Sequence, residues 1–104
     1  TIDQILSNDQ SENQPTVFSL NKVYPNPFNP ITTIEFSVPE NNNDKVRLRV
    51  FDIGGRMVET LTNKQYASGV YKLNWDASKL SSGIYFLEFK VGSLRDIRKL
   101  SLLK

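Results

Sequence analysis

The stretch that decides the fold is Tyr24-Pro25-Asn26-Pro27-Phe28-Asn29-Pro30, which contains three of the five prolines in the chain. Each proline fixes its backbone φ angle near about −65° and lacks an N–H group, so this stretch suits neither a helix nor a central strand. Asparagine side chains close turns by hydrogen-bonding to nearby backbone. We therefore predict a stiff turn that leads the chain into a strand, with Tyr24 and Phe28 anchoring the turn on a core.

Upstream of this turn the sequence has the character of a linker. Residues 1–16 are polar and slightly acidic, and their only apolar side chains before Val17 are Ile2, Ile5 and Leu6, which could form a short helical turn. The first residues show no signal-peptide pattern, and we interpret the chain as a C-terminal piece of a longer protein. We expect a flexible linker over residues 1–16, with the upstream part of the longer protein absent, and one folded domain over residues 17–104.

Downstream of the turn, apolar and polar residues alternate with the period of two that is typical of half-buried strands. Glycine pairs and Gly-Ser steps between these segments are suited to tight hairpins. The pattern predicts strands at residues 17–20, 33–38, 45–50, 57–61, 70–75, 84–91 and 96–103. Short strands with turn signals at this spacing favour an all-β fold, namely an antiparallel immunoglobulin-like β-sandwich of about seven strands without a disulfide.

Two of these segments allow a finer prediction. Residues 84–91 carry apolar side chains on both faces, which indicates a central strand covered on both sides. In the last segment, residues 96–103, Leu100 and Leu102 are expected to point into the core. Cations outnumber acids from Lys90 to the end of the chain, as is common on edge strands, where charge opposes aggregation.

The composition excludes several classes of function. Lys and Arg number 13 against 11 Asp and Glu, and this net charge of +2 is too small to indicate nucleic-acid binding. The chain has no cysteine for a disulfide or a thiolate, and no histidine to act as a general base or metal ligand. No apolar run approaches the roughly 18 residues of a membrane span. We find no catalytic constellation, zinc spacing or phosphate loop, and we predict neither an enzyme nor a cofactor.

A few polar and aromatic residues invite a functional interpretation, and each also has a structural one. Asp52 precedes a glycine turn and is expected to hydrogen-bond locally. Glu88 lies in mid-strand and is expected to face solvent or to pair with a cross-strand Lys or Arg. Oxygens of residues 41–44 and Asp76 could ligate calcium, but their spacing matches no known calcium loop. Trp75 alternates in phase with other apolar residues, which favours core packing over stacking on a sugar.

Taken together, five blocks of the sequence resemble a known family. They are residues 24–36, residues 50–58, Trp75-Asp76, residues 82–86 and residues 99–104. In order and spacing these blocks resemble the C-terminal sorting domain of type IX (Por) secretion system cargo, type A, over roughly residues 20–104. A related immunoglobulin-like domain of flagellar hook-capping proteins shares the proline-rich start and the Gly-Arg hairpin. The terminal Lys-x-x-x-Leu-Lys ending favours the sorting domain.

The resemblance implies a non-catalytic secretion signal at the end of a cargo protein. Family members pass through the periplasm after Sec export, are recognised by an outer-membrane translocon, and are then usually cleaved. The cargo is released or attached to surface lipopolysaccharide, so the expected location is secreted or on the outer cell surface. Cleavage would fall within residues 1–22. The residues that match the family's signal positions are Pro25, Asn26, Pro27, Gly83, Tyr85 and Lys99.

The partners implied are therefore the translocon with its processing machinery, the upstream cargo domain and surface lipopolysaccharide, with no nucleic acid and no membrane span. The last strand could be recognised through its edge, by strand addition, or through its charge. Two other interpretations remain open. One is a β-sandwich module that binds carbohydrate or protein and is appended to a secreted enzyme. The other is a structural domain like that of a hook cap in a flagellar assembly.

Overall fold

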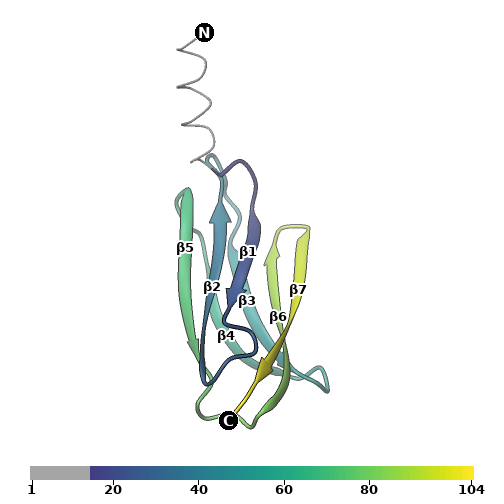
Figure 1. Ribbon diagram of the computed structural model, residues 1–104. Helices are drawn as coiled ribbons and strands as arrows, with labels where there is room; N and C mark the ends of the chain where they lie inside the picture. Colours follow the sequence, from purple (N-terminus) through teal and green to yellow (C-terminus); the bar gives the residue numbers. More distant parts are fainter. Residues whose placement is uncertain (1–14) are drawn as a thin grey trace, which may run out of the picture.

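The computed structural model describes residues 15–104, and in this range every regular element is a β-strand (Figure 1). The strands are β1 (Ser19–Tyr24), β2 (Ile31–Val38), β3 (Val46–Asp52), β4 (Met57–Lys64), β5 (Gly69–Asp76), β6 (Gly83–Val91) and β7 (Leu94–Leu102). Residues 15–104 contain no helix that is long and apolar enough to cross a membrane. The predicted all-β fold of about seven strands is confirmed.

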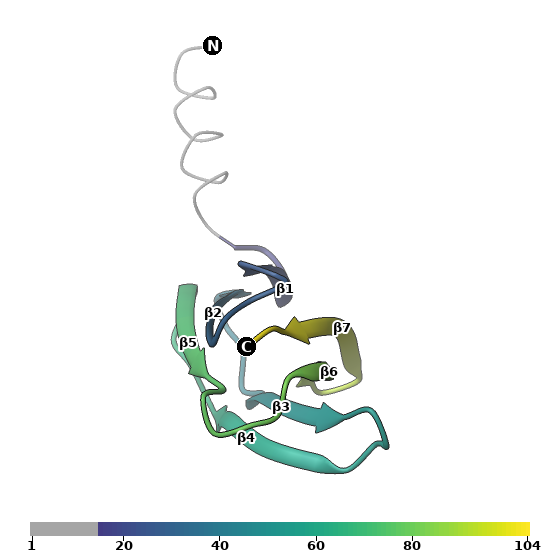
Figure 2. The ribbon, with the colours of Figure 1, turned by 60° about the horizontal axis from the view of Figure 1, so that its bottom comes forward.

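The strands form two antiparallel sheets that face each other (Figure 2). The three-stranded sheet has the order β1-β2-β5, and the four-stranded sheet has the order β4-β3-β6-β7. Short hairpins join β3 to β4 and β6 to β7, whereas the chain changes sheet between β2 and β3, between β4 and β5, and between β5 and β6. This arrangement is an immunoglobulin-like sandwich without a cysteine.

The core lies between the sheets and is built from alternate residues of each strand, because successive side chains of a strand point to opposite faces. The largest fully buried side chains are Trp75, Phe28, Phe36, Phe89, Ile34, Leu48, Leu87, Leu100 and Leu102. Leu100 and Leu102 point inward as the sequence predicts. Burial of this apolar surface is the main force that holds the two sheets together, since the chain has no disulfide.

The strand boundaries differ from the predicted ones at several ends. β1 runs to Tyr24, beyond the predicted residues 17–20, because it pairs with β2 as far as Thr33. β4 extends to Lys64 through residues expected to form a loop, since their backbone pairs with β3 up to Val46. β7 begins at Leu94, two residues earlier than predicted. In each case backbone pairing with a neighbouring strand overrides a polar local sequence.

The position of β6 confirms one prediction and corrects another. β6 lies between β3 and β7 and is therefore central, as its two apolar faces indicate. However, within residues 15–104 no second layer of strands covers its outer face, where Ile84 and Phe86 are half-buried. That face is covered only in part, by side chains from the neighbouring strands. The predicted linker over residues 1–16 lies almost entirely outside the described residues.

Candidate functional site

The connection between β1 and β2 contains the proline-rich stretch, and it takes a detour across the end of the sandwich. β1 and β2 are neighbours in one sheet, yet residues 25–30 pass beside the end of β7, which belongs to the other sheet (Figure 1). The peptide bonds before all three prolines are cis. Because residues 25–30 lie beside β7, this connection joins the edges of the two sheets at the end where the C-terminus lies.

Residues 26–28 pair with the free edge of β7, and we call these three residues the clamp. The side-chain amide of Asn26 donates from Nδ2 to the Lys99 carbonyl at 2.8 Å and accepts at Oδ1 from the Ser101 N–H at 3.0 Å. The backbone of Phe28 donates to the Ser101 carbonyl at 2.9 Å and accepts from the Leu103 N–H at 2.9 Å. The clamp therefore satisfies edge groups of β7 that would otherwise be open to another strand.

Phe28 fixes the clamp to the core. Its side chain is 2% exposed, and its ring centroid lies 5.5 Å from that of Trp75. On either side of it, the Thr32 hydroxyl donates to the Pro25 carbonyl and the Ala77 N–H donates to the Pro30 carbonyl. The predicted anchor at Phe28 is confirmed, because its aromatic ring fills the end of the core.

The predicted anchor at Tyr24 is wrong. Its side chain is exposed, with the Lys22 ammonium 4.9 Å from the ring centroid. Tyr24 is the last residue of β1 and pairs with Thr33, and its side chain points to the outer face of the three-stranded sheet. The alternation of the strand thus directs this ring outward.

On its other side β7 is paired with β6, which places Gly83 and Tyr85 beside the last residues of β7. Gly83 pairs with Leu102 and Tyr85 pairs with Leu100. Gly83 has a φ angle of +149°, a backbone conformation that favours glycine. Tyr85 is buried, and its hydroxyl donates to the Ser81 carbonyl at 2.7 Å.

All six candidate signal residues therefore surround the last residues of β7, but they are placed differently. Pro25, Asn26, Pro27, Gly83 and Lys99 are exposed, whereas Tyr85 is part of the core. Lys99 stands on the outer face of its sheet, opposite Phe86 in register. Tyr85 therefore supports the packing of the core. Asn26, Pro25, Pro27 and Lys99 are accessible to another molecule.

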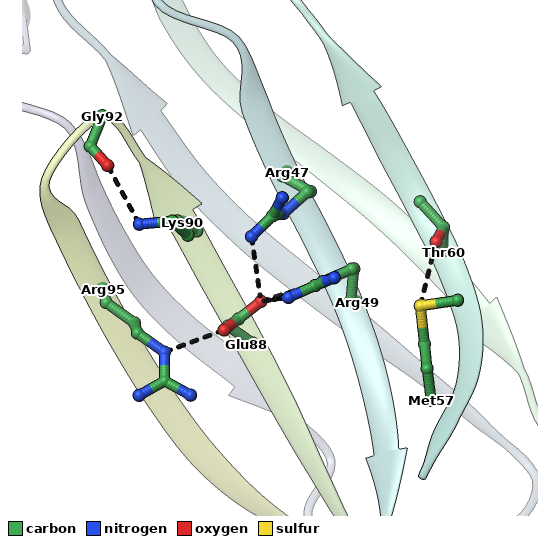
Figure 3. A network of polar contacts seen from close by, with 8 residues as sticks. All are labelled: Arg47, Arg49, Met57, Thr60, Glu88, Lys90, Gly92 and Arg95. Atoms are coloured by element: carbon green, nitrogen blue, oxygen red, sulfur yellow. Dashed lines mark hydrogen bonds and ion pairs between the residues drawn. The ribbon is translucent and has the colours of Figure 1, made fainter.

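Glu88 is paired, one of the two situations predicted for it, but it is not exposed (Figure 3). Its Oε1 accepts from Arg49 at 2.7 Å, its Oε2 accepts from Arg95 at 2.8 Å, and Arg47 lies 3.7 Å from Oε1. The side chain is on the outer face of β6 and yet is only 4% exposed, because these arginines cover it. Burial raises the pKa of Glu88, but hydrogen bonds from Arg95 and Arg49 outweigh burial and hold the pKa below its ordinary value.

Asp52 forms the local turn that the sequence predicts. Its Oδ1 accepts from the Arg56 and Gly54 N–H groups, both at 2.9 Å, and Arg56 also donates from Nε to Oδ2. The backbone hydrogen bond from Arg56 is the main cause that lowers the pKa of Asp52. This carboxylate therefore stabilises the hairpin between β3 and β4.

Trp75 and the residues considered for calcium are also placed. Trp75 is 1% exposed, which confirms the core interpretation, and its indole N–H donates to Glu59 Oε1 at 3.1 Å. Residues 41–44 follow the end of β2, whereas Asp76 pairs with Ile31 at its start, so the two lie at opposite ends of the sandwich. Within residues 15–104 no three acidic or histidine side chains are grouped as they would be to hold a metal ion.

These features define a small immunoglobulin-like β-sandwich whose C-terminal strand is held on one edge by β6 and on the other by the clamp. A family model described as the secretion system C-terminal sorting domain matches residues 22–102, which include the end of β1, the clamp and all of β2 to β7. The chain belongs to this family, the C-terminal sorting domains of type IX secretion cargo. No curated protein was found to match the chain.

Membership in this family has general implications for function. A sorting domain of this type implies an interaction with the type IX secretion machinery and export to the outer surface or the medium. Such signals are in general non-catalytic. The sequence resemblance is thereby confirmed at the level of the family.

Proposed function

We propose that this domain is the signal that directs an attached cargo protein through the type IX outer-membrane translocon, and that it has no catalytic role. The observation that supports this proposal most strongly is the clamp. Three blocks that the resemblance marks as signal, namely residues 25–27, Gly83 with Tyr85, and Lys99, are far apart in the sequence and meet around the end of one strand. A receptor that contacts this end would meet all three blocks at once.

The clamp also bears on how the strand is recognised. Recognition of residues 99–103 by strand addition would require displacement of the clamp, since Lys99, Ser101 and Leu103 already use edge groups to bond residues 26–28. We therefore propose recognition of the folded end of the domain. The groups available for it are Pro25, Pro27 and the side chain of Lys99, which are all exposed.

The two ends of the domain bear on how the cargo is attached and released. The start of β1 and the C-terminus lie at opposite ends of the sandwich, so upstream cargo would leave from the end remote from the clamp (Figure 1). Of the bonds within residues 1–22, those upstream of Ser19 can be cut without breaking a strand. We place the cleavage there, followed by release of the cargo or its attachment to surface lipopolysaccharide.

A secretion assay tests this function. The full 104-residue chain is fused behind a Sec signal and a fluorescent reporter, in a host with type IX secretion and in its translocon mutant. We expect reporter at the surface or in the medium of the parent strain only, together with loss of the sorting domain from the reporter. Reporter held in the periplasm of both strains would contradict the proposal and would favour a binding module appended to a secreted enzyme.

A matched pair of variants tests the role of Lys99. Lys99→Ala removes an exposed ammonium beside the clamp, and we expect it to weaken export while leaving the thermal unfolding temperature unchanged. Lys72→Ala removes an exposed cation from the three-stranded sheet and should leave export intact. Equal export by the two variants, or unfolding of Lys99→Ala, would exclude Lys99 from the signal.

A further inference from the structure

The outer face of the four-stranded sheet has an apolar pocket that the proposed sorting function does not use. It has a volume of about 440 Å³, within the usual size of ligand pockets. Its lining consists of Phe51, Asp52, Ile53, Gly55, Phe86, Glu88, Arg95 and Ile97. Ile53 is 76% exposed and Ile97 is 44% exposed, so two large aliphatic side chains at the pocket face solvent.

The same face carries a surplus of positive charge beside the pocket. Arg47, Arg49 and Arg95 converge on the single carboxylate of Glu88, which leaves two of the three guanidinium charges uncompensated (Figure 3). Glu88 is buried beneath them and is itself a wall of the pocket. Lys90 and Lys99 stand on the same face of β6 and β7, because they share the alternation of Glu88 and Ile97.

The arginines still have hydrogen-bond donors to offer. Arg95 uses its Nε to reach Glu88 Oε2, and its side chain is 56% exposed, so the terminal nitrogens remain accessible to another acceptor. The Arg47 side chain is 32% exposed, and its terminal nitrogen lies 3.7 Å from Glu88 Oε1, beyond hydrogen-bond distance, so this guanidinium is also open to a further acceptor. Guanidinium groups bind carboxylates through paired hydrogen bonds, and an additional carboxylate at this site would offset the charge surplus.

We propose that this face binds an acidic peptide segment of a partner protein, with one bulky apolar side chain of the segment seated in the pocket and its carboxylates on Arg95 and Arg47. Charge complementarity selects an acidic partner, and the apolar lining selects a side chain such as phenylalanine or leucine. The surface is separate from the clamp, since it lies on the outer face of the sheet and the clamp lies on the edge of β7. The proposal stands whether or not the domain is a sorting signal.

Binding of a defined peptide to the ¹⁵N-labelled 104-residue chain tests this proposal. The probe is a short capped peptide of aspartate and glutamate with one central phenylalanine, and NMR titration reports both affinity and location. We expect shifts concentrated at Phe51, Phe86, Arg95 and Ile97. Replacing the acids of the peptide by their amides, or its phenylalanine by alanine, should weaken binding at least about tenfold, and added salt should weaken it further.

Variants of the chain complete the test. Arg95→Ala and Ile53→Ser alter two exposed side chains that line the pocket, and each should weaken binding about tenfold with an unchanged circular dichroism spectrum. Lys72→Ala, on the other sheet, should bind as the parent does. The proposal is overturned by the absence of shifts at millimolar peptide, by shifts on the three-stranded sheet, or by equal binding of the amide peptide. It is equally overturned if sedimentation shows that the chain forms a dimer and that Ile53→Ser abolishes this dimer.

Discussion

The two sheets of this sandwich share one core but have very different outer faces. On the three-stranded sheet, Glu35 is paired in register with Lys22 on one side and Lys72 on the other, so opposite charges alternate across the strands. Beside them the Thr33 hydroxyl donates to Asn74 Oδ1 at 2.8 Å. This face is the ordinary solvated side of an antiparallel sheet.

On the four-stranded sheet the corresponding central acid, Glu88, is buried under three arginines and adjoins an apolar pocket. The same strand pairing therefore supports a central acid between two exposed lysines on one side of the molecule, and a central acid buried under three arginines beside a pocket on the other. The difference shows that the fold constrains only the inward residues, and that the outward residues distinguish a solvated surface from one suited to a partner.

The largest expected effect comes from the core on which both faces depend. Leu102→Asp places a carboxylate at a position that is 1% exposed, and we expect a loss of more than about 4 kcal/mol in the free energy of unfolding, enough to unfold the domain. Circular dichroism and urea unfolding measure it. The matched variant Leu103→Asp, at a side chain that is 55% exposed, should change stability by no more than about 0.5 kcal/mol. A folded Leu102→Asp domain would contradict the inward assignment of this residue.

The next effect separates the two outer faces directly. Glu88→Gln leaves three arginines without their shared carboxylate, and we expect it to cost about 1–3 kcal/mol. Glu35→Gln, at the corresponding position of the other sheet, should cost about 0.5 kcal/mol or less, because its hydrogen bond from Asn21 is exposed. Chemical unfolding of both variants gives the comparison, and equal losses would show that the two acids are equivalent.

A smaller effect is expected at the clamp. Asn26→Ala removes the two side-chain hydrogen bonds to Lys99 and Ser101, which are exposed, and should cost about 1 kcal/mol. Hydrogen exchange at the Ser101 amide should increase, whereas exchange at Leu100, which is paired with β6, should change little. Unchanged exchange at Ser101 would show that this amide is not held by Asn26.

The smallest effect is a dependence on pH. Because the pKa of Glu88 is held below its ordinary value of 4.5, its stabilising contribution is present above about that pH and is lost as the pH falls through the lowered pKa. We therefore expect the free energy of unfolding to decrease at acidic pH, and the decrease to be smaller in Glu88→Gln. Urea unfolding between neutral pH and pH 3 measures it, and identical pH profiles would exclude this linkage.

Much of the fold can be predicted from local sequence. The alternation of Ile34, Phe36 and Val38 and that of Val46, Leu48 and Val50 indicate strands with one buried face, and both sets are buried. The candidate site could be predicted only as separate blocks. The pairing of Asn26 with Ser101 joins residues 75 positions apart, and nothing in either local sequence indicates the other.

The amino-acid sequence by itself determined the strands, the stiff proline turn and the inward residues of this protein. The alternation of side chains along a strand and the fixed φ angle of proline are local properties that extend over only a few residues. Only the tertiary structure decided which strands are neighbours, and with them the clamp on β7 and the surroundings of Glu88. A mid-strand glutamate on the outer face is predicted to be exposed or paired, and its burial depends on arginines that β3 and β7 bring beside it. Such contacts arise from the register between strands, which is fixed by packing of the whole core.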